Sequence, residues 1–384
     1  MLENIHISGF SDEISSDFDT QLETVKNLGM QHISIRGVNE KNFSEYSIDE
    51  VNEYIKPKLD EYGIKVSSIG SPIGKVFIDD AEGFEKQVEL LEKLCKMANI
   101  LDCKYMRMFS FYMPEGKNPE DFKDEVINKL KVFTNIAEKY DIVLLHENEK
   151  DIYGDIASRC LTIFEEVGSD NFKGIFDFAN FVQCMEDTRA CYDLLKEHIV
   201  YYHIKDAVKE DKENVVCGTG QGKIEEILTD AIKNGYQGFL TLEPHLVLFD
   251  SLKDLELEDV NNIIKKDKGL DGKSAYALQY NSLVNILKSI DFRLKTLGGK
   301  EMKQVRFGIV GIGQMGGSHA EWLSGGKVDN AVLTAVCDVN PQKKEWAAEK
   351  LPQDVKFYDN YIDMLESGVA ISTASISPLS NISI

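Results

Sequence analysis

The sequence has no long apolar segment and few basic side chains. No run reaches the roughly 18 apolar residues that a membrane-spanning helix needs. The first residues also lack the basic start and apolar core of a secretory signal. Lys and Arg number 43 against 65 Asp and Glu, which gives a net charge of −22. Nucleic acids and anionic membranes are bound through basic side chains, so we expect neither as a partner.

The seven cysteines form no CxxC pair. Their scattered positions exclude a small zinc module and a regular disulfide framework. Free cysteine packs as a small apolar side chain, and thiols stay reduced inside the cell. We therefore expect reduced, buried thiols and a cytoplasmic location.

Short β-rich runs alternate with longer amphipathic stretches through residues 6–290. The runs with strand composition are His6–Gly9, His32–Arg36, Lys65–Gly70, Tyr105–Ser110, Ile142–His146, Gly174–Asp177, Val200–Ile204 and Phe239–Glu243. The stretches that follow them have the 3.6-residue period of helices, ending with a helix predicted over Ser274–Ile290. Eight such units predict a (β/α)8 TIM barrel, with a doubly wound open sheet as the alternative. Residues 246–273 interrupt the pattern and predict either a lid or a solvated connection.

A second pattern begins near Met302. Val305–Val310 and Val332–Cys337 are predicted strands, separated by a helix that runs through Leu323. A further helix is predicted over Pro341–Leu351, and residues 368–384 have no recognisable pattern. We therefore divide the chain into a barrel over residues 1–298 and a truncated, partial Rossmann-like βαβ unit over residues 299–384.

Polar side chains lie at the ends of four neighbouring strands of the predicted barrel. Strands five and six lead to Glu147 and Asp177, and strands seven and eight lead to His203 and Glu243. The C-terminal ends of barrel strands meet at one mouth, where barrel enzymes carry out their chemistry. Three carboxylates and one imidazole suit Mn²⁺, Mg²⁺ or Co²⁺, so the sequence predicts a divalent-metal site.

These strand ends belong to a longer series of motifs within residues 5–290. The motifs are Gly9–Glu13, Ser71–Lys75, Arg107–Tyr112, His146–Glu149, Ile152–Asp155, Asp177–Phe181, His203–Asp206, Gly235–Gly238 and Leu242–His245. Together they resemble the xylose isomerase-like barrels, which include sugar-phosphate isomerases and epimerases, inosose dehydratases and hydroxypyruvate isomerases. The resemblance implies that Glu147, Asp177, His203 and Glu243 hold the metal. This sequence differs from the epimerases of the superfamily at Asn180, where they often have a histidine.

The resemblance also implies that Glu147 and Glu243 transfer protons. A metal-bound carbonyl acidifies the neighbouring C–H, and a glutamate can remove that proton and return it. Return at the next carbon is isomerisation, return to the other face is epimerisation, and loss of a β-hydroxyl is dehydration. We expect an isomerase or epimerase of a small sugar, keto-acid or cyclitol, with an inosose-type dehydratase as the alternative. Assembly into a homo-oligomer stays open.

Two basic residues are further catalytic candidates. Arg107 lies on strand four, and Lys205 shares a strand face with His203. Each is expected either to contact a substrate oxygen or to pair with an acid of the site. Weaker candidates near the barrel strands are Glu149, His245, Glu13, Arg36 and His6. The loop Gly218–Gly222 predicts either a phosphate-binding turn or a tight turn that needs glycine.

The second unit carries Gly311, Gly313 and Gly316 between a strand and a helix, with Asp338 at the end of the next strand. This spacing is typical of a dinucleotide-binding fingerprint, in which the acidic residue binds the ribose hydroxyls of NAD. The unit resembles the start of the Gfo/Idh/MocA oxidoreductases, and the resemblance implies NAD as a ligand. Because the unit is truncated, we expect that it does not bind NAD functionally. The Glu-Lys-Pro motif and substrate domain of that family are missing from the sequence. An NAD-dependent oxidoreductase is therefore the least favoured function.

Overall fold

The computed structural model describes residues 2–247, 269–297, 305–325, 331–369 and 372–375. Most of the predicted lid or connection over residues 246–273 lies outside these ranges, as does Met302. The chain divides into two compact units, residues 1–292 and residues 293–384, and each is described by itself. The predicted division after residue 298 stays a prediction. Within the described ranges, no helix combines the length and the apolarity that crossing a membrane requires.

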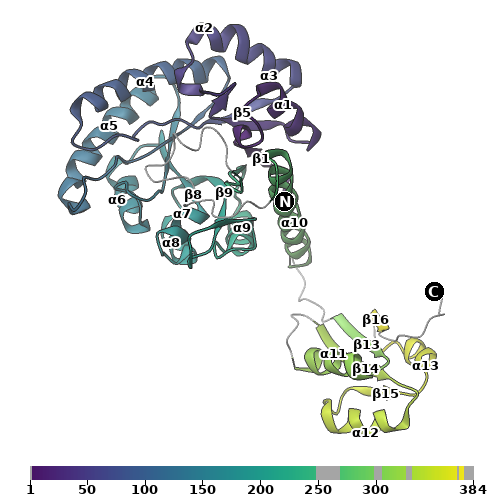
Figure 1. Ribbon diagram of the computed structural model, residues 1–384. Helices are drawn as coiled ribbons and strands as arrows, with labels where there is room; N and C mark the ends of the chain where they lie inside the picture. Colours follow the sequence, from purple (N-terminus) through teal and green to yellow (C-terminus); the bar gives the residue numbers. More distant parts are fainter. Residues whose placement is uncertain (1, 248–268, 298–304, 326–330, 370–371, 376–384) are drawn as a thin grey trace. The chain divides into compact units, whose positions relative to one another are not determined.

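Eight parallel strands form the sheet of the first unit (Figure 1). They are β1 (Ile5–Gly9), β2 (His32–Ile35), β5 (Lys65–Ile69), β6 (Tyr105–Met108), β7 (Val143–Glu147), β8 (Phe172–Asp177), β9 (Ile199–Ile204) and β12 (Gly238–Leu242). The strand order is β1-β12-β9-β8-β7-β6-β5-β2, and a bridge between Phe10 and Ser34 joins its two ends. The predicted (β/α)8 barrel is therefore confirmed, with small shifts at the strand ends.

Amphipathic helices follow the strands of the barrel. They are α1 (Phe18–Asn27), α4 (Ala81–Ile100), α5 (Lys123–Lys139), α6 (Ala157–Val167), α8 (Thr188–Leu195), α9 (Ile224–Lys233) and α10 (Gly272–Leu297). In α4 the buried residues Leu91, Leu94, Cys95 and Ala98 have the spacing of one helix face. The helical periodicity of the sequence thus located the layer that covers the barrel.

The helical stretch between β2 and β5, over residues 48–62, is not uniform. It consists of α2 (Ile48–Glu50), a wider π-helical turn (Val51–Ile55) and α3 (Lys56–Tyr62). Pro57 stands in the first turn of α3 and has no N–H to donate to the preceding turn, which accounts for the wider turn. Gly63 ends α3 in the left-handed conformation with φ 69°.

Several short elements at the C-terminal mouth were not predicted. They are the hairpins β3 (Gly37–Val38) with β4 (Lys41–Asn42) and β10 (Asp206–Ala207) with β11 (Asn214–Val215), and the helix α7 (Phe178–Gln183). Asp177 caps α7, because its Oδ1 accepts a hydrogen bond from the N–H of Asn180 at 2.8 Å. One carboxylate oxygen of Asp177 is therefore bound locally, and the other is left for the site.

Buried hydroxyl groups cross the interior of the barrel. The Tyr201 hydroxyl lies 2.9 Å from Ser67 Oγ, 3.0 Å from Ser68 Oγ and 2.6 Å from Thr241 Oγ1. Ser67 Oγ in turn lies 2.5 Å from Ser8 Oγ. These contacts join β1, β5, β9 and β12, so polar as well as apolar packing holds the strands in register.

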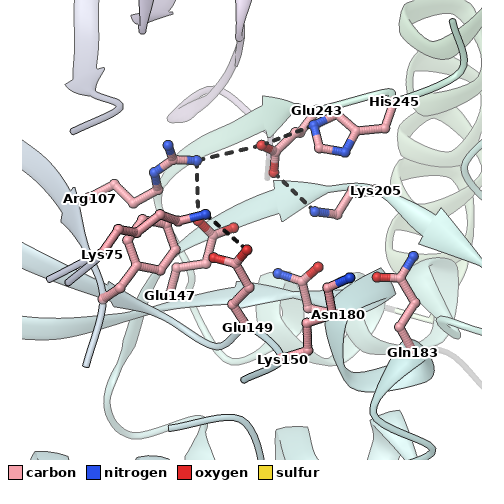
Figure 2. A pocket seen from close by; sticks show the side chains of 11 residues that line it. Lys75, Arg107, Glu147, Glu149, Lys150, Asn180, Gln183, Lys205, Glu243 and His245 are labelled. Carbon is pink, nitrogen blue, oxygen red and sulfur yellow. Dashed lines mark hydrogen bonds and ion pairs between the residues drawn. The ribbon is translucent and has the colours of Figure 1, made fainter. Parts of the chain in front are cut away.

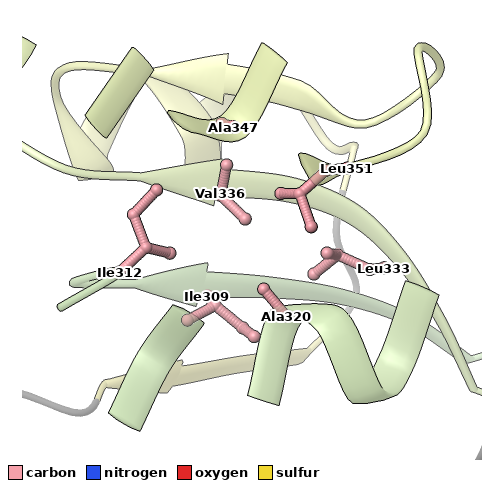
Figure 3. Close-up of a cluster of buried hydrophobic side chains, with 7 residues drawn as sticks. All are labelled: Ile309, Ile312, Ala320, Leu333, Val336, Ala347 and Leu351. Carbon is pink, nitrogen blue, oxygen red and sulfur yellow. The ribbon is translucent and has the colours of Figure 1, made fainter. Parts of the chain in front are cut away.

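The second unit contains a parallel sheet with the order β15-β14-β13-β16. Its elements are β13 (Val305–Val310), α11 (Gln314–Ser324), β14 (Ala331–Cys337), α12 (Pro341–Lys350), β15 (Lys356–Tyr358), α13 (Tyr361–Glu366) and β16 (Ser372–Ser375). Figure 3 shows its core, made of Ile309, Ile312, Ala320, Leu333, Val336, Ala347 and Leu351. This sheet is compatible with the predicted Rossmann-like unit, which stays a prediction, and β16 adds a strand where no pattern was recognised.

Candidate active site

The predicted metal ligands lie together at the C-terminal mouth of the barrel. Glu147 and Asp177 end β7 and β8, His203 lies in β9, and Glu243 directly follows β12. All four side chains are buried, and one ligand atom of each lies within 4.8 Å of the others. The barrel thus brings together four residues that are spread over almost 100 positions of the sequence.

His203 lies between two carboxylates. Its Nδ1 donates to Glu147 Oε1 at 2.7 Å and lies 3.3 Å from Glu243 Oε2. Burial alone would lower the pKa of His203, but the two glutamates raise it to about 9. In this state His203 is an imidazolium ion and supplies one positive charge to the centre of the cluster.

Two further cations neutralise the same acids. Arg107 Nη1 lies 3.3 Å from Glu147 and 3.5 Å from Glu243, and Lys205 Nζ lies 3.1 Å from Asp177 and 3.4 Å from Glu243. Figure 2 shows the ends of both side chains turned toward Glu243. Of the two roles expected for Arg107 and Lys205, the structure displays the pairing with acids of the site.

The carboxylates of the cluster differ in their affinity for protons. Burial acts to raise the pKa of Glu147, but His203 and Arg107 lower it to about 2. Burial opposes ionisation of Glu243 as well, and Lys205 and His203 nevertheless hold its pKa well below its usual range. For Asp177 burial prevails over the nearby Lys205 and raises the pKa to about 7. Both glutamates are therefore ionised at neutral pH.

A second group of side chains supports Glu243 from the side of β1 and β2. Arg36 Nη1 lies 3.0 Å from Glu243, and other nitrogens of Arg36 contact Asp12 and Glu13 at 2.9 and 3.2 Å. Glu13 also accepts the backbone N–H of His245 at 2.7 Å, which holds His245 in the left-handed conformation with φ 46°. These rim candidates therefore position Glu243.

His6 lies elsewhere. It begins β1 near the N-terminal end of the barrel, where its ring centroid is 5.4 Å from that of His32 and 5.6 Å from that of Phe239. Residue type alone could not tell the two ends of a strand apart.

A pocket opens onto the cluster. It is lined by Lys75, Arg107, Phe109, Glu147, Glu149, Lys150, Asn180, Gln183, Lys205, Glu243 and His245 (Figure 2). The sequence did not single out Lys150 or Gln183, and Lys75 and Phe109 were noted only as parts of motifs. Lys75 Nζ lies 2.9 Å from Glu149 and 4.6 Å from the centre of the Phe109 ring. The position of these four residues in the segments after β5, β6, β7 and β8 was the available signal.

A divalent cation fits the four-residue cluster. Its donor set of three carboxylates and one imidazole suits Mg²⁺, Mn²⁺, Co²⁺ or Zn²⁺. The cluster already gathers positive charge from His203, Lys205 and Arg107, as expected for acids that cannot be buried together unpaired. A second group, Glu13, Glu243 and His245, also has ligand atoms close together. Arg36 already lies between Glu13 and Glu243 and supplies the positive charge of this group, so we do not assign a metal to it.

The glycine-rich loop at residues 218–222 binds a carboxylate of its own chain. The N–H groups of Gly218, Gly220 and Gly222 each donate to the side chain of Asp206 at 2.9 Å. A Cβ atom at Gly220 would collide with Asp206, so the glycines are needed for this close approach. Of the two interpretations of the loop, the tight turn agrees with the structure.

The glycines predicted to form a nucleotide fingerprint lie between the end of β13 and the first turn of α11. Gly311 has φ 84°, which makes the tight turn after β13, and a Cβ at Gly316 would collide with the carbonyl oxygen of Gly311. Among the described residues, no atom lies within 4 Å of the position of a Cβ at Gly313, so the backbone there is open. Asp338 Oδ2 accepts the N–H of Ile312 at 2.9 Å and lies beside this loop.

Comparison with known proteins places the barrel in a family context. The model of the family described as "Xylose isomerase-like TIM barrel" matches residues 22–257. A probable L-ribulose-5-phosphate 3-epimerase, UlaE, of Mycoplasma pneumoniae is 22% identical over 147 residues, which is 38% of this chain and 47% of that protein. The 3-dehydroshikimate dehydratase of Bacillus anthracis is 23% identical over 128 residues, or 33% of this chain and 46% of that protein. The chain thus spans about half the length of the curated relatives that it matches.

Solved structures share the fold of the barrel. An L-ribulose 3-epimerase has a TM-score of 0.60 at 16% identity, covering 77% of this chain and 99% of that structure. The IOLI protein with a bound zinc atom has a TM-score of 0.57 at 17% identity, covering 74% and 99%. At such low identity these likenesses concern the fold alone.

We predict that metal binding releases protons from the cluster. In the metal-free protein His203 holds a proton because its pKa is raised to about 9, whereas a metal ligand must be a neutral imidazole. The affinity for Mn²⁺ should therefore fall as the pH is lowered, by about tenfold per pH unit for each proton released. Calorimetric titrations with Mn²⁺ in two buffers of different ionisation enthalpy count these protons. Binding without proton release would contradict the proposed role of His203.

Proposed function

Because the chain belongs to the xylose isomerase-like TIM barrel family, we propose that it is a divalent-metal-dependent isomerase or epimerase of a small sugar, keto-acid or cyclitol. The observation that carries this proposal is the position of two buried glutamates. Glu147 Oε1 and Glu243 Oε2 lie 2.7 and 3.3 Å from the same atom, Nδ1 of His203. Two proton acceptors that converge on one point are what isomerisation and epimerisation require.

The residues of this chain have distinct roles in the proposed reaction. Glu147 or Glu243 removes a proton from the carbon next to the substrate carbonyl, and the same or the other glutamate returns one. Both can accept a proton because both are ionised at neutral pH. Arg107 contacts both glutamates through Nη1 and so fixes their orientation. A divalent cation held by Glu147, Asp177, His203 and Glu243 would supply Lewis-acid polarisation of the carbonyl.

Asn180 supports assigning proton transfer to the glutamates. Its side chain donates to the carbonyl oxygen of Asn148 at 2.7 Å, and its N–H donates to Asp177. An amide is neither an acid nor a base near neutral pH, so Asn180 lines the pocket without carrying a proton to or from the substrate. Both proton-transfer steps are then left to Glu147 and Glu243.

A dehydratase is the second reaction that the same site can support. Removal of the proton next to the carbonyl, followed by loss of a β-hydroxyl, needs the same base and the same polarised carbonyl. The match to the 3-dehydroshikimate dehydratase of Bacillus anthracis favours keeping this alternative. The products of the reaction distinguish the two, because only dehydration forms a new double bond and releases water.

We further infer that the second unit binds a dinucleotide. The open backbone at Gly313, the turn at Gly311 and the close packing at Gly316 support this inference, because each has the role that the fingerprint assigns to its position. Asp338 would then meet the ribose hydroxyls. Hydride transfer is not part of the inference.

The first prediction from the proposed function concerns the exchange of substrate protons with solvent. The Mn²⁺-loaded protein, incubated in D₂O with ketoses, hydroxypyruvate and inosose, should incorporate deuterium next to the carbonyl of its substrate, as mass spectrometry can show. Glu243→Gln should abolish exchange and weaken Mn²⁺ binding by more than about tenfold, because it removes both a ligand and a proton acceptor.

Glu165→Gln is the matched control, since Glu165 is exposed on α6 and the charge change is the same. This variant should exchange deuterium as the wild type does. Absence of deuterium from every substrate and product would overturn the proposed chemistry, and unchanged metal affinity in Glu243→Gln would overturn the ligand assignment.

The second prediction uses the two tryptophans of the chain, Trp322 and Trp346, which both lie in the second unit. Their fluorescence should change on titration with NAD⁺. Gly313→Val should abolish the response without lowering the unfolding temperature, because the added side chain projects into open space where the pyrophosphate would approach. A wild-type protein that shows no saturable response at millimolar NAD⁺ would refute dinucleotide binding.

A further inference from the structure

The pocket gathers positive charge on a strongly acidic chain. The net charge is −22, and residues 302–384 carry 7 basic and 9 acidic side chains, so −20 belongs to residues 1–301. Yet the pocket is lined by four cations, Lys75, Arg107, Lys150 and Lys205. They come from the segments around β5, β6, β7 and β9, so four separate parts of the barrel direct a basic residue to one place (Figure 2).

The acids of the pocket do not account for all of this charge once a metal is bound. The lining includes three glutamates, and Asp177 belongs to the adjoining cluster. Four cations therefore balance these four carboxylates. Arg36, Asp12 and Glu13, which contact Glu243 or one another, add one negative charge, so a divalent cation would leave a surplus of about one positive charge. A neutral sugar offers nothing to balance that surplus, whereas an anionic substrate does.

Lys75 and Lys150 are the cations best suited to receive the anion. Arg107 and Lys205 each contact two carboxylates of the four-residue cluster, so they serve the metal ligands. Lys75 and Lys150 line the pocket outside that cluster. The side chain of Lys75 is only 7% exposed and is held between Glu149 and the Phe109 ring, which fixes its amino group before a ligand arrives.

The structure also bears on which anion fits. Barrels that bind phosphate commonly use backbone N–H groups in the loops after strands seven and eight. Here the loop after the seventh strand, β9, has three of its N–H groups bonded to Asp206. The N–H groups of Gly218, Gly220 and Gly222 are not left for a phosphate, and the remaining candidates in the described pocket are side chains. Lysine amino groups bind carboxylates and phosphates alike as point charges, and a surplus of about one charge suits a carboxylate better than a doubly charged phosphate.

We propose that the substrate carries a carboxylate group, held by Lys75 and Lys150 while its carbonyl faces Glu147 and Glu243. This inference rests on the proposed function of the site and narrows its substrates from sugars, keto-acids and cyclitols to small hydroxy-keto acids. The carboxylate balances the surplus charge and orients the reacting carbon toward the two glutamates.

Three ligands with a shared hydroxyketone core test this inference. Calorimetry with the Mn²⁺-loaded full chain compares hydroxypyruvate, dihydroxyacetone and dihydroxyacetone phosphate. On the shared core they carry a carboxylate, a hydroxymethyl group and a phosphorylated hydroxymethyl group, respectively. Hydroxypyruvate should bind at least about tenfold more tightly than the other two, as expected for a charge-assisted hydrogen bond. Equal binding of all three, or tighter binding of the phosphate, would overturn the inference.

Lysine variants separate recognition by the pocket from direct binding of the carboxylate to Mn²⁺. Lys75→Met and Lys150→Met should each lower the affinity for hydroxypyruvate by about tenfold and leave that for dihydroxyacetone unchanged. Lys196→Met, at the exposed end of α8, makes the same charge change away from the pocket and should have no effect. A preference for hydroxypyruvate that persists in both pocket variants would overturn the role of the lysines.

The outcome also separates this inference from the proposed function. Preferential binding of hydroxypyruvate without any deuterium exchange supports carboxylate recognition and overturns the isomerase chemistry. Deuterium exchange into dihydroxyacetone without tighter binding of hydroxypyruvate supports the isomerase chemistry and overturns carboxylate recognition.

Discussion

The buried carboxylate of Glu243 needs positive partners, because a carboxylate removed from water without a counter-charge is strongly destabilised. Its positive partners are Arg36 at 3.0 Å, His203 at 3.3 Å, Lys205 at 3.4 Å and Arg107 at 3.5 Å. They stand on or next to β2, β6 and β9. The neutralisation of one carboxylate therefore requires the barrel to close around it, and the geometry of the whole mouth depends on that requirement.

The same requirement keeps the site ready for a metal. Cations lower the pKa of both glutamates, so the ligands are ionised before any metal arrives. The proton on His203 occupies the centre of the cluster and can leave when a metal provides the charge instead. Arg36, Arg107 and Lys205 remain as fixed charges, which prevents the acids from moving apart. The protein thus maintains a compact group of acids in either state.

Strand ends were predictable, whereas contacts across the mouth were not. The alternation of strands and helices located Glu147, Asp177 and Glu243, because every barrel strand delivers its last residues to the same rim. Arg36 and Glu243 are 207 positions apart, and no local pattern links them. Lys150 and Gln183 line the pocket from segments without periodicity. Such contacts depend on how the loops fold over the completed barrel, which the sequence does not encode locally.

Asp206 acts as an anion that the chain carries within itself. Its carboxylate occupies a receptor made by three backbone N–H groups, in the way that a bound phosphate or sulfate would. A residue with a shorter, uncharged side chain would leave that receptor vacant at the rim of the barrel, where an external anion could replace it. The side chain at this one position thus determines whether the loop binds its own carboxylate or an external anion. An evolving barrel could acquire phosphate binding by losing this internal competitor, without building any new group to attract the ligand.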